Sequence, residues 1–416
     1  MDLFDKLKSN MGPLGQYAEK AEGYYIFPRL EGELSSRMTF NGNEVICWSI
    51  NNYLGLGNHP EVRKADAQAA ADWGLAYPMG SRMMSGNTAL HDQFETQLAD
   101  FVSKEAAVLV NFGYQGIMSA IDCLIDRHDV VVYDADCHAC IVDGVKMHLG
   151  KRFAYEHNDV ESLERCLRRA TKLVEANQKG SILVISEGVF GMRGEQGKLR
   201  EIIALKNQYN FRILVDDAHG FGTLGATGAG AGEEQGVQDE IDIYFATFAK
   251  AMGSVGAFLA STKEVTRFMK YNMRSQIFAK SLMMPLVVSG MKRLEMMRTM
   301  PELKNKLWEN VNALQSGLKE RGFDIGNTNS CVTPVYMHGS VAEATNLVSD
   351  LRENHHIFCS IVVYPVIPKG MMLLRLIPTA MHTMKDIEDT LDAFDAIKDR
   401  LESGGYQSEK ILKKIL

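Results

Sequence analysis

Residues 211–219 have the sequence FRILVDDAH, in which a short apolar run ends in two aspartates and a histidine. A run this short and this apolar is typical of a strand that is buried on both faces of a sheet. Similar runs are AAVLVN (106–111), DVVVYD (129–134), SILVISE (181–187), IDIYFATFAK (241–250) and GAFLAS (256–261). Because helical stretches separate these runs, the pattern predicts an α/β fold with a mainly parallel central sheet covered by helices.

The chain is long enough to divide into lobes. It has 416 residues, 46% of them hydrophobic, which is enough for a large core. We predict an N-terminal arm over residues 1–55, a large domain over 56–285 and a smaller α+β C-terminal domain over 286–416. In the last, a long amphipathic stretch ends at Gly322, and the segments 331–337, 343–354, 371–378 and 386–401 are predicted as strand, helix, strand and helix.

Charge and hydropathy narrow the classes of partner. The formal net charge of -7 gives no general attraction to nucleic acid or to anionic membranes, so a small-molecule substrate is expected. The N-terminus MDLFDKLKSN has no signal-peptide run, and no segment approaches 18 uninterrupted apolar residues. We therefore expect a cytoplasmic protein without an integral membrane segment.

The cysteines predict reduced thiols. Seven cysteines are scattered along the chain, unlike the dense pairing of secreted disulfide scaffolds. Cys137 and Cys140 form CxxC, but no second pair lies at zinc-finger spacing. No metal site is predicted.

Polar or glycine-rich residues follow five of the predicted strands. They are Asn111 and Gly113, Asp134 and His138, Ser186 and Glu187, Asp216 and His219, and Thr247 and Lys250. In open α/β sheets, ligands bind just beyond the carboxyl ends of the strands. One pocket could therefore collect all five clusters.

Lys250 is the first candidate for chemistry. It lies in FATFAKAMGS (245–254), among small residues that follow a strand. Desolvation in such a place lowers a lysine pKa and makes the amine a nucleophile, which suits a Schiff base. A surface lysine that opens a helix is the alternative for this residue taken alone.

Asp216 and His219 point to pyridoxal phosphate. The strand delivers Asp216 to its carboxyl end, and His219 follows three residues later. A carboxylate keeps the pyridine nitrogen of this cofactor protonated, and an imidazole can bind its phenolic oxygen. A metal site lacks an obvious third ligand, and a purely structural pair is the remaining alternative.

Weaker candidates surround this pair. His138 could lie against a cofactor ring or simply pack in the core, and NFGYQG (111–116) could cradle a phosphate at a helix N-terminus, with a hydroxyl from Thr247. Arg375 stands alone among apolar residues, where a substrate carboxylate or an internal salt bridge would compensate its charge.

Seven motifs together resemble those of the α-oxoamine synthases, a fold-type-I family of pyridoxal-phosphate enzymes that includes serine palmitoyltransferase, aminolevulinate synthase and 8-amino-7-oxononanoate synthase. They follow the family's order and spacing over nearly the whole chain. The motifs are NNYLGLGNHP (51–60), GSRMMSG (80–86), DADCHACIVDG (134–144), SEGVFGMRGE (186–195), VDDAHGFGTLG (215–225), TFAK (247–250) and RLIPTAMHT (375–383).

The resemblance implies a homodimer with shared active sites and a set of residue roles. Lys250 would carry the cofactor as a Schiff base and act as catalytic base. His138 would stack on the ring, Asp216 would pair with the pyridine nitrogen, and His219 and Ser186 would lie near the phenolic oxygen. Gly113, Tyr114 and Thr247 would contact the phosphate, and Asn52 and Arg375 would hold the substrate carboxylate.

The implied reaction is a decarboxylative condensation. An amino acid joins an acyl thioester, donated by coenzyme A or a carrier protein, to give a 2-amino ketone, CO2 and free thiol. FPRLEG (27–32) and GSRMMSG (80–86) are most similar to the lipid-forming branch, which uses serine for sphingolipids or cysteate for sulfonolipids. Glycine- and alanine-using members, an aminotransferase on the same fold and a catalytically silent partner subunit are the alternatives.

The chain also departs from the family pattern. Ala246 and Ala249 alter the lysine motif, and Gly191 and Cys140 stand where serines are common. Lys280 stands among residues that in the family reach the neighbouring subunit's cofactor phosphate. An extra cation here would bind that phosphate or favour a doubly anionic amino acid, so cysteate is expected slightly ahead of serine.

Overall fold

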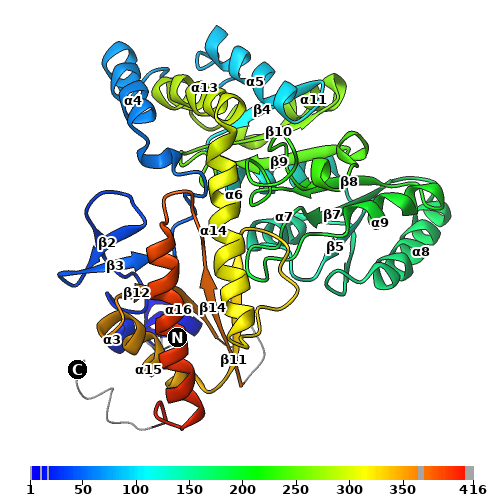
Figure 1. Cartoon of the computed structure of the whole chain (residues 1–416). Coiled ribbons are helices and arrows are strands. Elements are labelled where there is room, and N and C mark those ends of the chain that lie inside the picture. The colour runs from blue at the N-terminus through cyan, green and yellow to red at the C-terminus, as the bar shows by residue number, and fades with distance from the viewer. Residues whose placement is uncertain (1, 10–11, 16–17, 364–369, 408–416) are drawn as a thin grey trace. The chain divides into compact units, whose positions relative to one another are not determined.

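The computed structural model describes residues 2–9, 12–15, 18–363 and 370–407. Its largest sheet has seven strands in the order β4-β10-β9-β8-β7-β5-β6 (Figure 1). The strands are β4 (Ala106–Val110), β5 (Val130–Asp134), β6 (Lys151–Tyr155), β7 (Ile182–Glu187), β8 (Arg212–Asp216), β9 (Ile243–Thr247) and β10 (Ala257–Ser261). The strand β10 runs antiparallel to both of its neighbours, β4 and β9, and the other adjacent pairs of this sheet are parallel.

The predicted mainly parallel sheet is confirmed, and all six predicted strands are present. The strand that the prediction did not include is β6, which lies at the edge of the sheet and is largely solvent-accessible. An edge strand that is not buried on both faces needs no continuous apolar run. Its sequence, KRFAY, therefore carried no strand pattern of the kind used for the other six.

Helices cover both faces of this sheet. The α-helices of unit 2 are α4 (Pro60–Trp73), α5 (Ala89–Phe101), α6 (Gly113–Leu124), α7 (Ala139–Met147), α8 (Val160–Asn177), α9 (Leu199–Ala204), α10 (Ala231–Glu234), α11 (Lys263–Asn272), α12 (Arg274–Ile277), α13 (Met284–Thr299) and α14 (Pro301–Glu320). Alternate residues of β8 divide between two hydrophobic clusters, Ile213 and Val215 in one and Leu214 in the other. The first cluster includes residues of α5, α8, α9, α13 and α14, and the second includes residues of α6, α7 and α11.

The long amphipathic stretch before Gly322 is two helices, α13 and α14. Pro301 is the first residue of α14, and Met300 separates it from α13. A proline lacks the backbone N–H that would continue the preceding helix, but its fixed φ suits a first helical turn.

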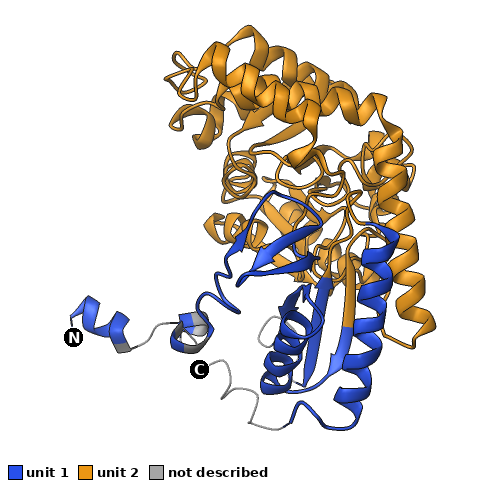
Figure 2. Ribbon diagram, turned by 60° about the vertical axis from the view of Figure 1, so that its left-hand side comes forward, with its two compact units in different colours: residues 1–49, 336–375, 383–416 blue, residues 50–335, 376–382 orange. Residues whose placement is uncertain are grey.

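The chain forms two compact units, shown in two colours in Figure 2. Unit 2 spans residues 50–335 and 376–382 and holds the seven-stranded sheet, and unit 1 spans 1–49, 336–375 and 383–416. These limits differ from the predicted boundaries at 55 and 285. The division into an arm, a large domain and a C-terminal domain stays a prediction.

Unit 1 contains helices α1 (Leu3–Ser9), α2 (Gly12–Gly15), α3 (Ala18–Ala21), α15 (Val341–Glu353) and α16 (Met384–Glu402). It also holds a four-stranded sheet of β1 (Leu30–Glu31), β2 (Arg37–Phe40), β3 (Asn43–Cys47) and β12 (Ile357–Phe358). Unit 1 also holds β13 (Ser360–Val362), residues 336–338 of β11 (Thr333–His338) and residues 371–375 of β14 (Met371–Leu376). These three strands form a sheet in the order β11-β14-β13. The predicted strands at 331–337 and 371–378 and the predicted helices at 343–354 and 386–401 are confirmed as β11, β14, α15 and α16. None of the helices in the described ranges has the length and apolar character needed to cross a bilayer.

Candidate active site

Several predicted site residues of unit 2 lie at the carboxyl ends of the parallel strands. The strands β7 and β8 end at Glu187 and Asp216, which are register partners on neighbouring strands. The neighbouring strand β9 ends at Thr247, three residues before Lys250. His138 follows β5, which pairs with β7 on the other side. Four successive strand ends therefore bring these residues to one edge of the sheet.

Asp216 is the buried acid of the site. Its side chain is nearly inaccessible, and its Oδ1 accepts a hydrogen bond from the N–H of Ala218 at 3.0 Å. Burial raises the pKa of Asp216, while the charge of Lys250, the Ala218 N–H and His138 act in the opposite direction. Lys250 and His138 are thus close enough to Asp216 to stabilise its ionised form, as the predicted constellation requires.

His138 is held at the N-terminus of α7. Its Nδ1 accepts a hydrogen bond from the Cys140 N–H at 3.3 Å and lies 2.9 Å from the Cys140 Sγ. Although its ring is solvent-accessible, partial desolvation lowers the pKa of His138, and the charge of Asp216 opposes this effect. Tyr114 meets the ring edge to face, with the ring centroids 6.2 Å apart. A neutral, accessible imidazole in a fixed orientation can lie flat against a ligand ring.

His219 is fixed from two sides. Its Nδ1 shares a hydrogen bond of 2.6 Å with the hydroxyl of Tyr53, a contact that the sequence analysis did not assign. Gly191 packs against the other edge of the ring, because a Cβ at this position would lie 2.2 Å from His219 Nε2. The glycine that stands in place of a common serine therefore leaves room for this position of the imidazole.

The N-terminus of α6 forms a place for an anion. The helix begins at Gly113, and no side chain caps its first turn. A Cβ at Gly113 would lie 3.2 Å from both Cβ and Oγ1 of Thr247, so the two residues are in close contact. The exposed side chain of Tyr114 donates its hydroxyl to Asp143. Backbone N–H groups at a helix N-terminus and an adjacent threonine hydroxyl fit a phosphate.

Asn52 and Ser186 are buried in the same unit. Asn52 Oδ1 accepts a hydrogen bond from the Gly57 N–H at 2.9 Å and lies against Gly253, where a Cβ would be 3.0 Å away. The N–H of Gly253 donates to the carbonyl of Lys250 at 2.9 Å, so Asn52 adjoins the turn that carries the lysine. Ser186 lies on β7, one residue before Glu187.

Two predicted site residues are placed differently. Lys280 is exposed, and its backbone carbonyl accepts a hydrogen bond from Asn111 at the end of β4. Arg375 lies on β14 in unit 1, where Ser360 is its register partner. The roles predicted for Lys280 and Arg375 in the site stay predictions.

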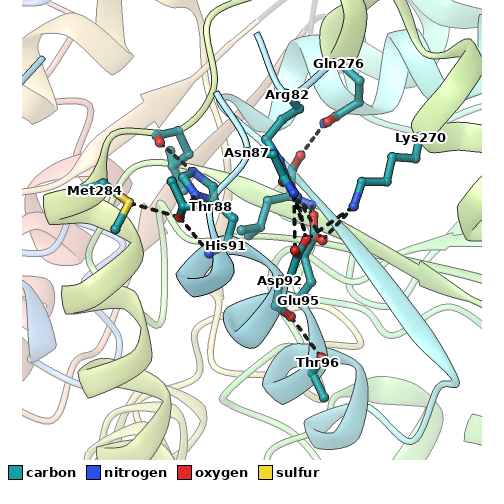
Figure 3. A network of polar contacts seen from close by, with 12 residues as sticks. Arg82, Asn87, Thr88, His91, Asp92, Glu95, Thr96, Lys270, Gln276 and Met284 are labelled. Carbon is teal, nitrogen blue, oxygen red and sulfur yellow. Dashed lines mark hydrogen bonds and ion pairs between the residues drawn. The ribbon is translucent and has the colours of Figure 1, made fainter. Parts of the chain in front are cut away.

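A polar network fixes the GSRMMSG loop (Figure 3). Arg82 is buried and donates two hydrogen bonds to Glu95, at 2.7 and 3.0 Å, and Glu95 also accepts from the N–H of Leu109 on β4. The N–H of Ser281 donates to the carbonyl of Gly80 at 2.9 Å. The loop is therefore tied both to β4 and to the residue after Lys280. Neither Arg82 nor Glu95 was among the predicted site residues.

These residues fit pyridoxal phosphate. The buried carboxyl of Asp216, a half-buried lysine on the next strand end and the close contact of Gly113 with Thr247 supply groups for the pyridine nitrogen, the aldehyde carbon and the phosphate. Within the described residues, no group of three or more histidine, cysteine or acidic side chains could hold a metal ion.

A family model, aminotransferase class I and II, matches residues 43–394 of the chain. The chain belongs to this family. It is 64% identical over 407 residues to the cysteate-C-fatty acyltransferase of Capnocytophaga ochracea, covering 98% of this chain and 97% of that protein. It is 32% identical to the serine palmitoyltransferase of Sphingobacterium spiritivorum, covering 90% and 92% of the two chains. The serine palmitoyltransferase of S. paucimobilis, solved with a bound PLP–myriocin aldimine, superposes with a TM-score of 0.87 at 28% identity, covering 97% of this chain and all of that one.

This aminotransferase-family chain has relatives in the lipid-forming branch that the motifs resembled. The predicted family, the fold-type-I architecture, the acyltransferase class and the cofactor are confirmed. The chain is therefore a member of the family although it has Ala246 and Ala249 in the lysine motif and a glycine at position 191.

Proposed function

We propose that the protein condenses cysteate with a long-chain acyl thioester. A bond forms between Cα of the amino acid and the thioester carbonyl carbon. The carboxylate leaves as CO2, and the thiol departs. The observation that carries this proposal is the 64% identity to a cysteate-C-fatty acyltransferase over nearly the whole chain, against 32% to a serine palmitoyltransferase.

The residues at the carboxyl edge of the sheet would divide the work. Pyridoxal phosphate, when bound, supplies an electron sink for the bonds that break at Cα. Lys250 would hold the cofactor and move the Cα proton, because it follows the end of β9 by three residues and its charge favours the ionised form of Asp216. Asp216 would keep a positive charge on the pyridine nitrogen, since Lys250 and the Ala218 N–H favour its ionised form.

The remaining residues would bind and orient. His138 would cover one face of the cofactor ring, and His219, fixed by Tyr53, would bind the phenolic oxygen together with Ser186. The phosphate would rest on the α6 N-terminus. The phosphate would contact Gly113, Tyr114 and Thr247, and the substrate carboxylate would bind Asn52 and Arg375. Lys280 would be an additional cation for the phosphate or the substrate.

The proposal extends to the assembly and the donor. We infer a cytoplasmic homodimer in which each active site uses residues of both subunits, with a coenzyme A or carrier-protein thioester as acyl donor. The exposed position of Lys280, next to the buried Ser281, is compatible with a side chain that reaches a neighbouring subunit.

Serine is the second candidate substrate. The support for it is the similarity to two serine palmitoyltransferases, one of them over 97% of this chain in structure. The hydroxymethyl group of serine is neutral, whereas the sulfonate of cysteate is an anion at every working pH. A cation in the site should therefore favour cysteate over serine.

The test is a panel of amino acids with palmitoyl thioester and saturating cofactor. Cysteate, serine, glycine and alanine are compared by thiol release and by the mass of the product. We expect cysteate to have the highest kcat/KM and to yield a sulfonated 2-amino ketone. Preference for serine would transfer the proposal to sphingolipid synthesis. Amino transfer to a keto acid without thiol release would contradict the condensation itself.

A further inference from the structure

Glu187 is a second buried acid beside Asp216. It is the last residue of β7, and its side chain is 5% exposed against 4% for Asp216. The two residues are register partners on neighbouring parallel strands, so their side chains leave the sheet on the same face. Within the described residues, Glu187 makes no ion pair with a lysine or arginine. Glu187 has no part in the proposed mechanism.

The carboxyl group of Glu187 holds the backbone of His138. Its Oε1 accepts a hydrogen bond from the His138 N–H, at the point where the chain turns into α7. Cys140 fixes the imidazole at Nδ1. Glu187 therefore fixes the backbone N–H of His138, and Cys140 fixes its imidazole ring.

We propose that Glu187 is a positioning residue that works in its protonated, neutral form. One carboxyl oxygen accepts from the His138 N–H and thereby sets the position of the imidazole. Because the group carries no charge, Asp216 stays the single anion of the pair. The inference rests on the proposed function only in that His138 and Asp216 face the cofactor.

Electrostatics agrees with this geometry. Burial and then the charge of Asp216 raise the pKa of Glu187 well above its usual range, against the opposing effects of the His138 N–H and Lys250. Burial also raises the pKa of Asp216, but the nearby Lys250 comes first among the effects that lower it. Two adjacent buried carboxyl groups rarely ionise together, and the one that is better compensated keeps the charge. Titratable or charged groups from three segments of the chain face Glu187. Asp216 comes from β8 and Lys250 from the turn after β9, and the others come from β5, the loop after it and α7: Asp134, Cys137, His138 and Cys140.

Two substitutions in the holoenzyme separate the acceptor from the charge. Glu187→Gln keeps an acceptor oxygen and is neutral at every pH, whereas Glu187→Leu removes the acceptor. Hydrogen exchange of peptides spanning residues 135–142 reports the His138 N–H, with β9 as an internal standard. The pH titration of the cofactor's absorbance reports the charge near Asp216. Neither measurement requires turnover.

We expect Glu187→Gln to match the wild type in both measurements, with exchange within about twofold and no shift of the titration midpoint. Glu187→Leu should speed exchange of the His138 segment by about tenfold or more, the effect of losing one buried hydrogen bond. A clear shift of the midpoint in Glu187→Gln would mean that Glu187 is charged, and unchanged exchange in Glu187→Leu would mean that it does not hold His138. Either result overturns the inference. Failure of the cysteate proposal would leave both measurements unaltered and would appear only in the substrate panel.

Discussion

The two edges of the seven-stranded sheet handle their charges in opposite ways. At the amino edge, Asp242 accepts hydrogen bonds from Lys206 at 2.6 Å, from Arg212 at 2.7 Å and from the N–H of Ile213 at 2.8 Å. At the carboxyl edge, burial raises the pKa values of both Asp216 and Glu187. Two cations compensate Asp242 at the amino edge, whereas the carboxyl edge brings two carboxyl groups together near a single lysine.

The difference shows which kind of observation identifies the site. A cavity of about 550 Å³ lies at the amino edge and is lined by Lys104, Arg212, Asp242 and other residues of that edge. Its volume falls within the range of small-molecule pockets. However, Asp242, one of the three acidic residues that line it, is already paired with Lys206 and Arg212. Incompletely compensated buried charge, rather than cavity size, marks the edge where a charged cofactor and substrate are expected.

Lys250→Ala is the most severe way to break the carboxyl edge. No other amine among the site residues lies beyond the end of β9, so we expect loss of both the cofactor's absorption band and turnover. The check is an absorbance spectrum of the purified variant together with thiol release. A variant that kept the wild-type band would assign the Schiff base to another lysine.

Asp216→Asn tests the charge of the same edge without changing its shape. The amide can still accept the Ala218 N–H, so the turn should persist and some cofactor should remain bound. The neutral group no longer stabilises a protonated pyridine nitrogen, and we expect kcat to fall roughly 100-fold, the scale of one lost electrostatic contact in an active site. Near-normal turnover would show that another residue protonates the ring.

Most of this carboxyl edge could be predicted from the sequence. Apolar runs that end in Asp216, Ser186 and Thr247 fix both the strand and the side chain at its end, because parallel strands align their carboxyl ends. The hydrogen bond of Tyr53 to His219 could not be predicted, because it joins residues 166 positions apart that no periodic pattern relates. The edge strand β6 was missed because its exposed residues need no apolar run.

Lys280→Ala distinguishes a substrate contact from a cofactor contact. If the ammonium group binds the sulfonate in a pair that is partly desolvated in the assembled site, its removal leaves an anion uncompensated. This should cost cysteate about 2 to 5 kcal/mol, a loss of tens-fold or more in kcat/KM. Serine, glycine and alanine should change little at saturating cofactor. A uniform fall across all four amino acids, with weaker cofactor retention, would assign Lys280 to the phosphate.

Asp217 extends the comparison to stability. This fully buried acid follows Asp216 and accepts hydrogen bonds from the Ala231 N–H at 2.8 Å and the Tyr244 hydroxyl at 3.1 Å. Burial raises the pKa of Asp217 from 3.8 to about 7. A raised pKa means that the folded state holds its proton more tightly than the unfolded state. The stabilisation is therefore complete below the unfolded pKa and is lost as the pH rises through the folded pKa.

Asp217→Asn should remove this dependence. From pH 5 to pH 8, the unfolding free energy of the wild type should fall by about 2 to 3 kcal/mol more than that of the variant. The loss spans about two pH units, from pH 5 to the folded pKa of about 7, at roughly 1.4 kcal/mol each. Urea unfolding of both proteins at the two pH values gives the difference. An equal pH dependence in the two proteins would show that Asp217 is ionised throughout.

The smallest expected effect comes from the amino edge, and it is the matched control for Asp216→Asn. Asp242→Asn makes the same chemical change just before β9, at the end of the strand opposite to the proposed active site. The variant keeps an oxygen to accept the Ile213 N–H. It loses the pairing with Lys206 and Arg212, and because the Arg212 side chain is 74% exposed, this pairing is worth only about 1 kcal/mol in stability. We expect kcat/KM for every amino acid to stay within about twofold of the wild type, and the urea midpoint to fall slightly. If Asp242→Asn instead lowered turnover as much as Asp216→Asn, charge compensation would not distinguish the two edges, and the large cavity at the amino edge would have to be considered as part of the functional site.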